Sequence, residues 1–88
     1  MVYYESTVRK AIAKGTLPQA VVKTIHNAFL SIDATRDFAL FDIKEMRGDY
    51  RRTYYRLRKG KYRAMFYVED DIYVVYIGKR DEVYRLWE

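Results

Sequence analysis

The 88-residue sequence contains no cysteine, and it has only one proline, one tryptophan and one histidine. Without cysteine the chain can form neither a disulfide nor a metal site built on thiolates. It has no run of about 18 apolar residues, the length that would predict a membrane-spanning helix. Its first residues, MVYYEST, lack the basic and then apolar pattern of a signal peptide. We therefore expect a cytoplasmic protein with no membrane partner.

Several patterns that mark enzymes and cofactor proteins are also missing. No metal-ligand spacing, nucleophile elbow or phosphate-binding glycine loop occurs, so we expect no metal and no cofactor. The lone histidine, His26, lies beside apolar residues of an expected helix, and we assign it no chemistry. The acidic run 69–71 resembles a paired-carboxylate site, but its place between two expected strands favours a solvated hairpin tip.

What the chain does have is apolar and aromatic residues in abundance. Half of the sequence is hydrophobic, with ten tyrosines and four phenylalanines. At this length one small core is expected. We therefore predict a single domain that covers residues 1–88.

The positive charge is concentrated in one segment. Residues 45–67 hold eight basic residues against two acidic ones, Glu45 and Asp49, whereas the net charge of the whole chain is +5. A basic surface interleaved with aromatic rings is suited to a phosphate backbone and to base stacking. The segment indicates a nucleic-acid partner, and RNA in particular.

Residue spacing predicts two helices in the first half of the chain. After a short β-type run at residues 2–4, Ser6 is a good N-cap and Gly15 ends the first helix. Pro18 suits the first position of a second helix, whose apolar stripe continues to Ile32. Residues 33–37 are expected to form a loop, and residues 38–46 a mixed connector.

After Gly48 the apolar period becomes two, which is typical of strands. We expect strands at residues 52–58, 62–68 and 72–77, with turns at Lys59-Gly60 and at residues 69–71, and with Gly78 ending the last strand. The predicted fold class is α+β, in the order β-α-α-β-β-β, with a helical hairpin packed on one face of a small, mostly antiparallel sheet.

Alternate residues of a strand share a face, so the basic side chains of this sheet should gather on the face away from the helices. Arg63 should lie there with Met65, and Arg56 should approach it across the hairpin. On the last strand Val74, Tyr76 and Gly78 should share a face with Arg80, and Gly78 should leave room for a base or backbone to approach. Few acidic residues are close in sequence, and unpaired like charges on a sheet are unfavourable. This indicates an anionic partner.

Four segments of the chain resemble the sequence pattern of the RelE/ParE superfamily, the toxic halves of bacterial and archaeal toxin–antitoxin pairs. They are LPQAVV (17–22), IKEMRG (43–48), YYRLRKGKYRAMFYVEDD (54–71) and IGKRDEVYR (77–85). Together they extend over nearly the whole chain. The resemblance implies a RelE-like fold and a role as the toxin of a type II toxin–antitoxin system.

In the RelE branch the toxin cleaves messenger RNA in the ribosomal A site without a metal, and the 2′-hydroxyl of the RNA attacks the neighbouring phosphate. Carried over by position, the resemblance implies four catalytic residues: Arg56, Arg63, Arg80 and Tyr84. The arginine fork binds phosphate oxygens in pairs, and cations stabilise the extra charge of the phosphorane. The nearby RNA-binding residues are expected to be Arg52, Tyr54, Arg58, Lys59, Lys61 and Lys79.

One position departs from the family pattern. Well-known RelE members have a second lysine where this chain has Tyr54, and a tyrosine with a pKa of about 10 is a poor base at neutral pH. The identity of the general base, and the efficiency of cleavage, are therefore left open.

Two other functions fit the same resemblance. One is a ParE-like toxin that inhibits DNA gyrase by binding, and the other is a degenerate member that only binds its antitoxin. ParE-type members generally lack the full basic and tyrosine set, so its presence here favours the ribonuclease. The expected partners are an acidic cognate antitoxin, the ribosome with messenger RNA in its A site, and ribosomal RNA.

Overall fold

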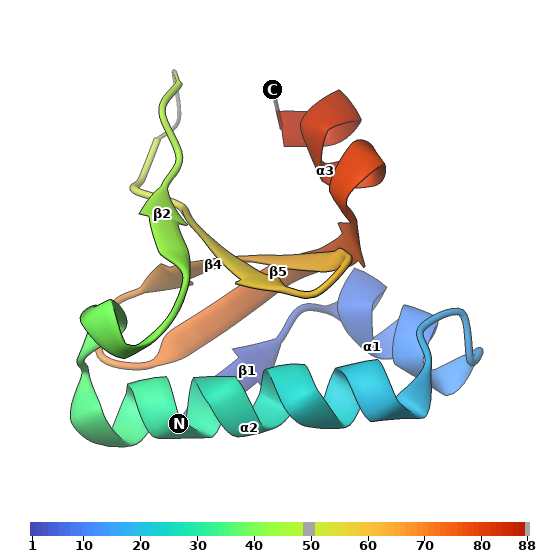
Figure 1. Cartoon of the computed structure of the whole chain (residues 1–88), viewed down its shortest axis with the longest axis horizontal. Coiled ribbons are helices and arrows are strands. Elements are labelled where there is room, and N and C mark those ends of the chain that lie inside the picture. The colour runs from blue at the N-terminus through green and yellow to red at the C-terminus, as the bar shows by residue number, and fades with distance from the viewer. Residues whose placement is uncertain (49–50, 88) are drawn as a thin grey trace.

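The computed structural model of the chain describes residues 1–48 and 51–87, and Asp49 of the basic segment lies outside them. Figure 1 shows the order of the elements along the chain. They are β1 (Val2–Tyr4), α1 (Ser6–Ala13), α2 (Gln19–Thr35), a 3-10 turn η1 (Phe38–Leu40), β2 (Ile43–Glu45), β3 (Tyr55–Lys59), β4 (Tyr62–Val68), β5 (Ile72–Lys79) and α3 (Arg80–Trp87).

The elements form a mixed sheet between helices. The sheet has the order β1-β5-β4-β3-β2, in which β1 runs parallel to β5 and the other pairs are antiparallel. Helix α2 runs along one face, and α3 rises from the end of β5 on the opposite side (Figure 1). The predicted α+β class and the mostly antiparallel sheet are confirmed.

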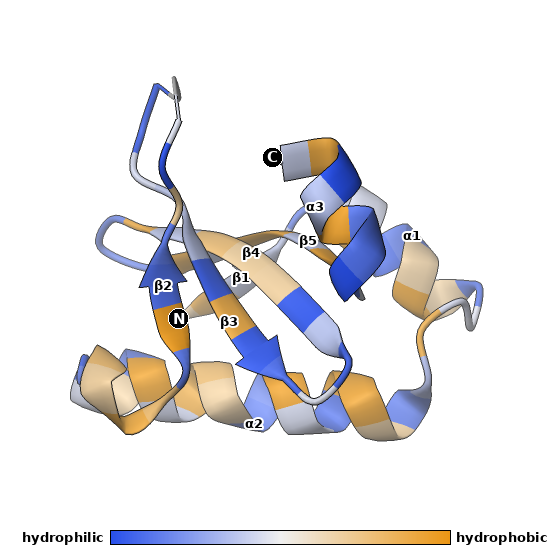
Figure 2. Ribbon diagram, turned by 45° about the horizontal axis from the view of Figure 1, so that its top comes forward, coloured by the Kyte–Doolittle hydropathy of each residue, from blue (hydrophilic) through white to orange (hydrophobic). Residues whose placement is uncertain are grey.

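The main core lies between α2 and the sheet. Figure 2 shows hydrophobic residues along α2 where it passes beneath the strands. Phe29 of α2 is fully buried and meets the edge of Phe66 of β4, with 5.0 Å between the ring centroids. Ile32 and Leu57 are buried in the same cluster. The apolar stripe recognised in the sequence therefore faces the sheet, and its burial supplies the main stabilisation of the fold.

A second, smaller core lies on the other face, under α3. Val83 of α3 is fully buried against Met65 of β4, which is also fully buried, and against Met46. The prediction that the face of Arg63 and Met65 is open to solvent was therefore wrong. It failed because residues 80–87 form a helix that covers part of that face.

A β-bulge changes the parity of β5. Met65 pairs with Tyr76 but Phe66 pairs with Val74, so Val75 is the extra residue. Val74 and Ile77 both join the main core as a result, whereas Tyr76 packs beside the second core. The prediction that Val74 shares a face with Tyr76 and Gly78 was wrong because strict alternation does not hold across a bulge.

Other boundaries differ from those expected. The connector 38–46 contains η1 and the edge strand β2, the strand predicted from residue 52 begins at Tyr55, and α2 continues to Thr35. Gly78 lies within β5 and does not end it. Helix α2 ends where Arg36 adopts a left-handed conformation (φ 56°). The Arg36 guanidinium donates to the carbonyl of Asp70 at 2.6 Å.

Candidate functional site

A basic hollow lies between the β3–β4 turn and the first residues of α3. Its volume is about 370 Å³, and it is lined by Gly60, Lys61, Arg63, Lys79, Arg80 and Asp81. The N–H of Arg80 donates to the carbonyl of Lys61 at 3.1 Å, which joins the start of α3 to the turn. The turn consists of Gly60 and Lys61, one residue later than the predicted Lys59-Gly60, because Lys59 is the last residue of β3 and pairs with Tyr62. Gly60 takes the positive φ (58°) that such a turn needs.

Arg63 is the centre of this site. It stands opposite Arg58 of β3 and Gly78 of β5, and only 6% of its surface is exposed. Its Nη1 donates to the carbonyls of Gly60 (2.8 Å) and Tyr62 (2.9 Å). Its Nε is buried and has no hydrogen-bond partner among the described residues. Arg63 also lines the hollow, and a guanidinium at such a place is suited to receiving an anion.

The electrostatic surroundings of Arg63 are strongly positive. Burial lowers the pKa of its guanidinium, and the nearby charges of Arg58, Arg56 and Arg80 lower the pKa further. Tyr84 acts in the opposite direction. Like charges held together in this way are costly unless an anion joins them.

Arg80 and Tyr84 stand one turn apart on α3. The guanidinium carbon of Arg80 lies 5.2 Å from the centroid of the Tyr84 ring, a cation–π distance. The structure thus brings together the four residues to which the resemblance gave catalytic roles, Arg56, Arg63, Arg80 and Tyr84. Their roles stay predictions.

Two arginines of the site share one carboxylate. Asp42 pairs with Arg56 (3.2 Å) and with Arg58 (3.6 Å). The sequence analysis counted only acidic residues close in sequence to these arginines. It therefore missed Asp42, which lies just before β2 and pairs with arginines of the neighbouring strand β3. Arg58 stays more than half exposed despite this pair. Arg56 is largely buried, and its Nε lacks a partner among the residues that the structure describes.

The residues expected to bind RNA divide into two groups. Lys59 ends β3 with its Nζ 5.5 Å from the centroid of the Phe41 ring, so its side chain does not line the hollow. Lys61 and Lys79 line the hollow, and Arg58, which stands opposite Arg63, lies beside it. Arg52 and Tyr54 do not. Tyr54 precedes Arg58 by four residues, a distance of about 13 Å along a strand.

At that far end both side chains have partners of their own. Arg52 lies 4.0 Å above the ring of Tyr67 and pairs with Glu69 at 3.3 Å. The ring of Tyr54 packs edge-on against Tyr67 and Trp87. The structure therefore separates Arg52 and Tyr54 from the basic hollow.

The space beside Gly78 is filled, contrary to the sequence-based expectation. A Cβ atom at Gly78 would lie only 2.7 Å from Oε2 of Glu82 and 2.7 Å from the Tyr76 ring. Sequence reasoning missed Glu82 because it missed α3. The helix was nevertheless readable from apolar residues at 83, 86 and 87, with Asp81 and Glu82 in its first turn.

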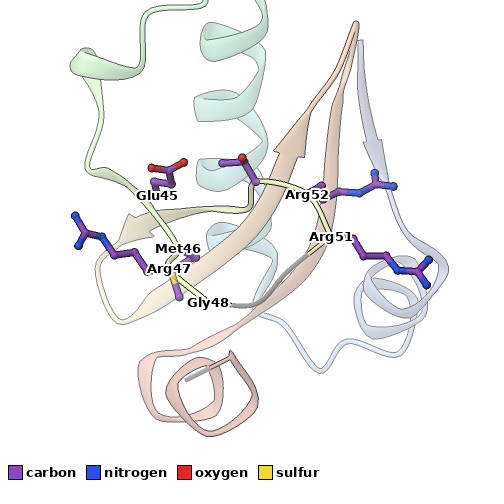
Figure 3. A pocket seen from close by; sticks show the side chains of 7 residues that line it. Glu45, Met46, Arg47, Gly48, Arg51 and Arg52 are labelled. Carbon is purple, nitrogen blue, oxygen red and sulfur yellow. The ribbon is translucent and has the colours of Figure 1, made fainter.

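A second basic hollow, of about 420 Å³, follows β2. Figure 3 shows that Arg47 points away from Arg51 and Arg52, so the three guanidiniums do not converge on one point. Their divergence makes this hollow a weaker anion site than the one around Arg63.

The described residues hold neither a cluster of metal ligands nor a membrane-spanning helix. No group of three or more His, Cys, Asp or Glu side chains there could hold a metal ion. No helix within the same residues is long and apolar enough to cross a membrane.

Comparison with known proteins identifies the fold. No family model matches the sequence, and no curated protein matches it either. A chain in the crystal structure of the RelB–RelE antitoxin–toxin complex from Methanococcus jannaschii is similar in structure, with a TM-score of 0.74 and 24% sequence identity. The match covers 98% of this chain and 99% of that one. The chain is an α+β protein, and its fold is RelE-like.

Proposed function

We propose that this protein is the toxin of a type II toxin–antitoxin system and acts as a ribosome-dependent, metal-independent endoribonuclease. The observation that carries the proposal is the buried Arg63, which lines the hollow and lies among Arg56, Arg58, Arg80 and Tyr84. The similar structure is that of an antitoxin–toxin complex, which supports the toxin role through the shared fold.

The proposed reaction uses the 2′-hydroxyl of the RNA as its nucleophile. A base removes the 2′-hydroxyl proton, the 2′-oxygen bonds to phosphorus, and the bond from phosphorus to the 5′-oxygen breaks as an acid protonates that oxygen. The products are a 2′,3′-cyclic phosphate and a 5′-hydroxyl. Arg63 and Arg80 would bind the phosphorane oxygens, whose negative charge increases in the transition state. Tyr84, beside Arg80, would donate the proton to the 5′-oxygen.

Tyr54 packs at the far end of the sheet, away from the hollow. The general base that takes the 2′-hydroxyl proton should therefore be a residue of the hollow itself. Asp81 is the carboxylate that lines the hollow together with Arg63 and Arg80. Carboxylates serve as general bases when they lie within hydrogen-bonding reach of the proton. We assign Asp81 this role, and Asp81→Asn should lower the rate while leaving RNA binding intact.

The exposed cations around the hollow would bind the partners. Lys61 and Lys79 line the hollow and Arg58 stands opposite the buried arginine. Together with Lys59 at the end of β3, they would contact messenger RNA in the A site and ribosomal RNA. An acidic antitoxin that folds over the same cations would silence the toxin in the cytoplasm. On a sizing column at moderate salt, the toxin co-expressed with such an antitoxin should elute as a complex.

The decisive experiment maps messenger RNA by primer extension on ribosomes programmed with a defined codon in the A site. Protein that has been treated with EDTA and then freed of the chelator should produce cuts within the A-site codon when it is added to these ribosomes, and no cuts should appear without ribosomes. Intact messenger RNA, together with growth arrest in cells and inhibition of gyrase supercoiling, would contradict the proposal and support a ParE-like toxin.

A further inference from the structure

A second pocket adjoins the basic hollow and has a different character. It encloses about 240 Å³ beside the end of β5, between α3 and the end of α1. Ala11 and Leu17 form an apolar wall, Tyr62 and Tyr76 contribute aromatic rings, and Lys79 and Glu82 provide charge. Drug-sized ligands need about 300 Å³ or more, so this pocket suits one small planar group.

The carboxylate of this pocket is held in place. The hydroxyl of Tyr76 donates to Oε2 of Glu82 at 3.0 Å. Burial raises the pKa of Tyr76, and the hydrogen bond to Glu82 raises it further, so the phenol stays a donor at neutral pH. Within residues 1–48 and 51–87, Oε1 of Glu82 accepts no hydrogen bond, so the carboxylate keeps acceptor capacity for a ligand.

The pocket and the basic hollow are neighbours. Lys79 lines both of them, and Gly78, which lines the pocket, stands directly opposite Arg63. A phosphate at Arg63 would therefore have its adjoining nucleoside within reach of the pocket. Single-stranded RNA is read in this way elsewhere, with a base stacked on aromatic rings and hydrogen-bonded along its edge.

We propose that this pocket binds a guanine base next to the phosphate held by Arg63 and so sets the base preference of the toxin. The inference rests on the function proposed above. A carboxylate accepts hydrogen bonds, and guanine presents two donors, N1–H and the 2-amino group, on a single edge. Uracil offers one donor, and its carbonyl oxygens would face the carboxylate unfavourably. Tyr76 is a positioning residue that orients Glu82.

The test is equilibrium binding of labelled RNA tetranucleotides that differ at one base: guanine, inosine, adenine, cytosine or uracil. The wild-type protein should bind the guanine RNA roughly tenfold more tightly than the uracil RNA, as expected of one paired base edge. Inosine, which lacks the 2-amino group, should fall between them. Glu82→Gln should reduce the guanine-to-uracil ratio to about one, and Tyr76→Phe should reduce it in part.

Two further variants separate the pocket from general electrostatics. Glu5→Gln removes the same charge from an exposed position before α1 and should keep the ratio. Gly78→Ala keeps the charge, but its Cβ would displace Glu82 and Tyr76, so it should lose the ratio. Because the readout is a ratio, a general rise in RNA affinity after loss of a negative charge does not affect it.

The binding assay needs no ribosome and no cleavage, so it stands apart from the test of the proposed function. Equal binding of all five RNAs by the wild-type protein would overturn the pocket assignment even if the protein cleaves messenger RNA. A guanine preference that survives both Glu82→Gln and Gly78→Ala would overturn it as well. A preference that both variants abolish would support it even if no cleavage were found.

Discussion

Arg63 is the most deeply buried cation among the described residues. A guanidinium taken out of water loses much of its hydration, and two backbone carbonyls restore only part of it here. The neighbouring arginines add repulsion, which is why its pKa is lowered. Such an arrangement costs stability in the free protein, and strain of this kind clusters at functional sites. An anion bound in the hollow that Arg63 lines would offset this repulsion.

A second residue with a perturbed environment gives a prediction about pH. Burial raises the pKa of Tyr4 to about 12, and its hydroxyl lies 2.9 Å from Nδ1 of His26. Since the folded pKa exceeds the ordinary value of 10, the stabilising contribution is complete below pH 10 and is lost as the pH rises toward 12. Between pH 10 and pH 12, the melting temperature of the wild-type protein should fall further than that of Tyr4→Phe.

Differential scanning fluorimetry at half-unit pH steps measures this loss. The matched control is Tyr3→Phe, because Tyr3 lies on the same strand and is 43% exposed. If the curves for wild type and Tyr4→Phe were parallel from pH 9 to pH 12, the buried tyrosine would not be the source of the alkaline loss.

At the scale of single elements, α3 is the helix that the sequence analysis did not predict, whereas the strands and α2 were predicted. The apolar period of two predicted β3, β4 and β5, and the helical stripe predicted α2, because each pattern reports one buried face. The covering of the second face by α3 could not follow from those strands, since a partly covered face and a solvated face have similar alternation around Arg63. The bulge at Val75 could not be predicted from the sequence, because β5 places apolar residues in the cores on both faces of the sheet. The pattern is therefore apolar with or without an extra residue.

The same reasoning explains which parts of the site were predictable. Arg56, Arg63, Arg80 and Tyr84 came from a resemblance between short motifs, and the fold does bring them together. Asp42, Glu82 and the separate place of Tyr54 depend on long-range packing that no local pattern reports. Gly78 was read as open space because the residues that fill it come from α3.

The packing of α3 leads to a prediction about stability. Val83 is fully buried between α3 and the sheet, so Val83→Ala should lower the free energy of unfolding by about 1–2 kcal/mol through lost burial and a small cavity. Leu86 lies on the same helix but is 65% exposed, so Leu86→Ala should change the free energy of unfolding by less than about 0.5 kcal/mol. Urea denaturation monitored by circular dichroism compares the two, and equal losses would contradict the packing described for α3.

At the scale of the whole molecule, charge is unevenly placed. The β3–β4 turn and the end of β5 carry several cations around one hollow, whereas the acidic turn 69–71 lies at the opposite end of β4 and β5. Figure 2 shows hydrophilic residues at the β3–β4 turn and at the start of α3. An uneven distribution of this kind orients a polyanion toward one end of the protein and speeds its association.

This distribution predicts a salt dependence. RNA binding should weaken steeply as salt rises, and replacing Lys59 and Lys61 with alanine should reduce the slope of log K against log salt by about 1.4, two phosphate contacts on a single strand. The control replaces Lys10 and Lys23, exposed lysines of α1 and α2. An unchanged slope in the Lys59 and Lys61 variant would show that these two lysines are only solvated. The cleavage rate at saturating protein should stay nearly the same.

The most direct measurement of the central claim is the single-turnover cleavage of A-site messenger RNA by Arg63 variants at saturating protein. Arg63→Ala should be slower than wild type by roughly a hundredfold or more, as expected when one preorganised donor worth about 3 kcal/mol is lost. Arg63→Lys should recover only part of the rate, because a lysine keeps the charge without the fork. Arg47→Ala, which removes an exposed cation outside the hollow, is the control for lost charge and should cleave at nearly the wild-type rate. In both Arg63 variants, ribosome binding should fall much less than the cleavage rate. A folded Arg63→Ala protein that cleaves within about threefold of wild type would contradict the claim that this buried arginine stabilises the transition state.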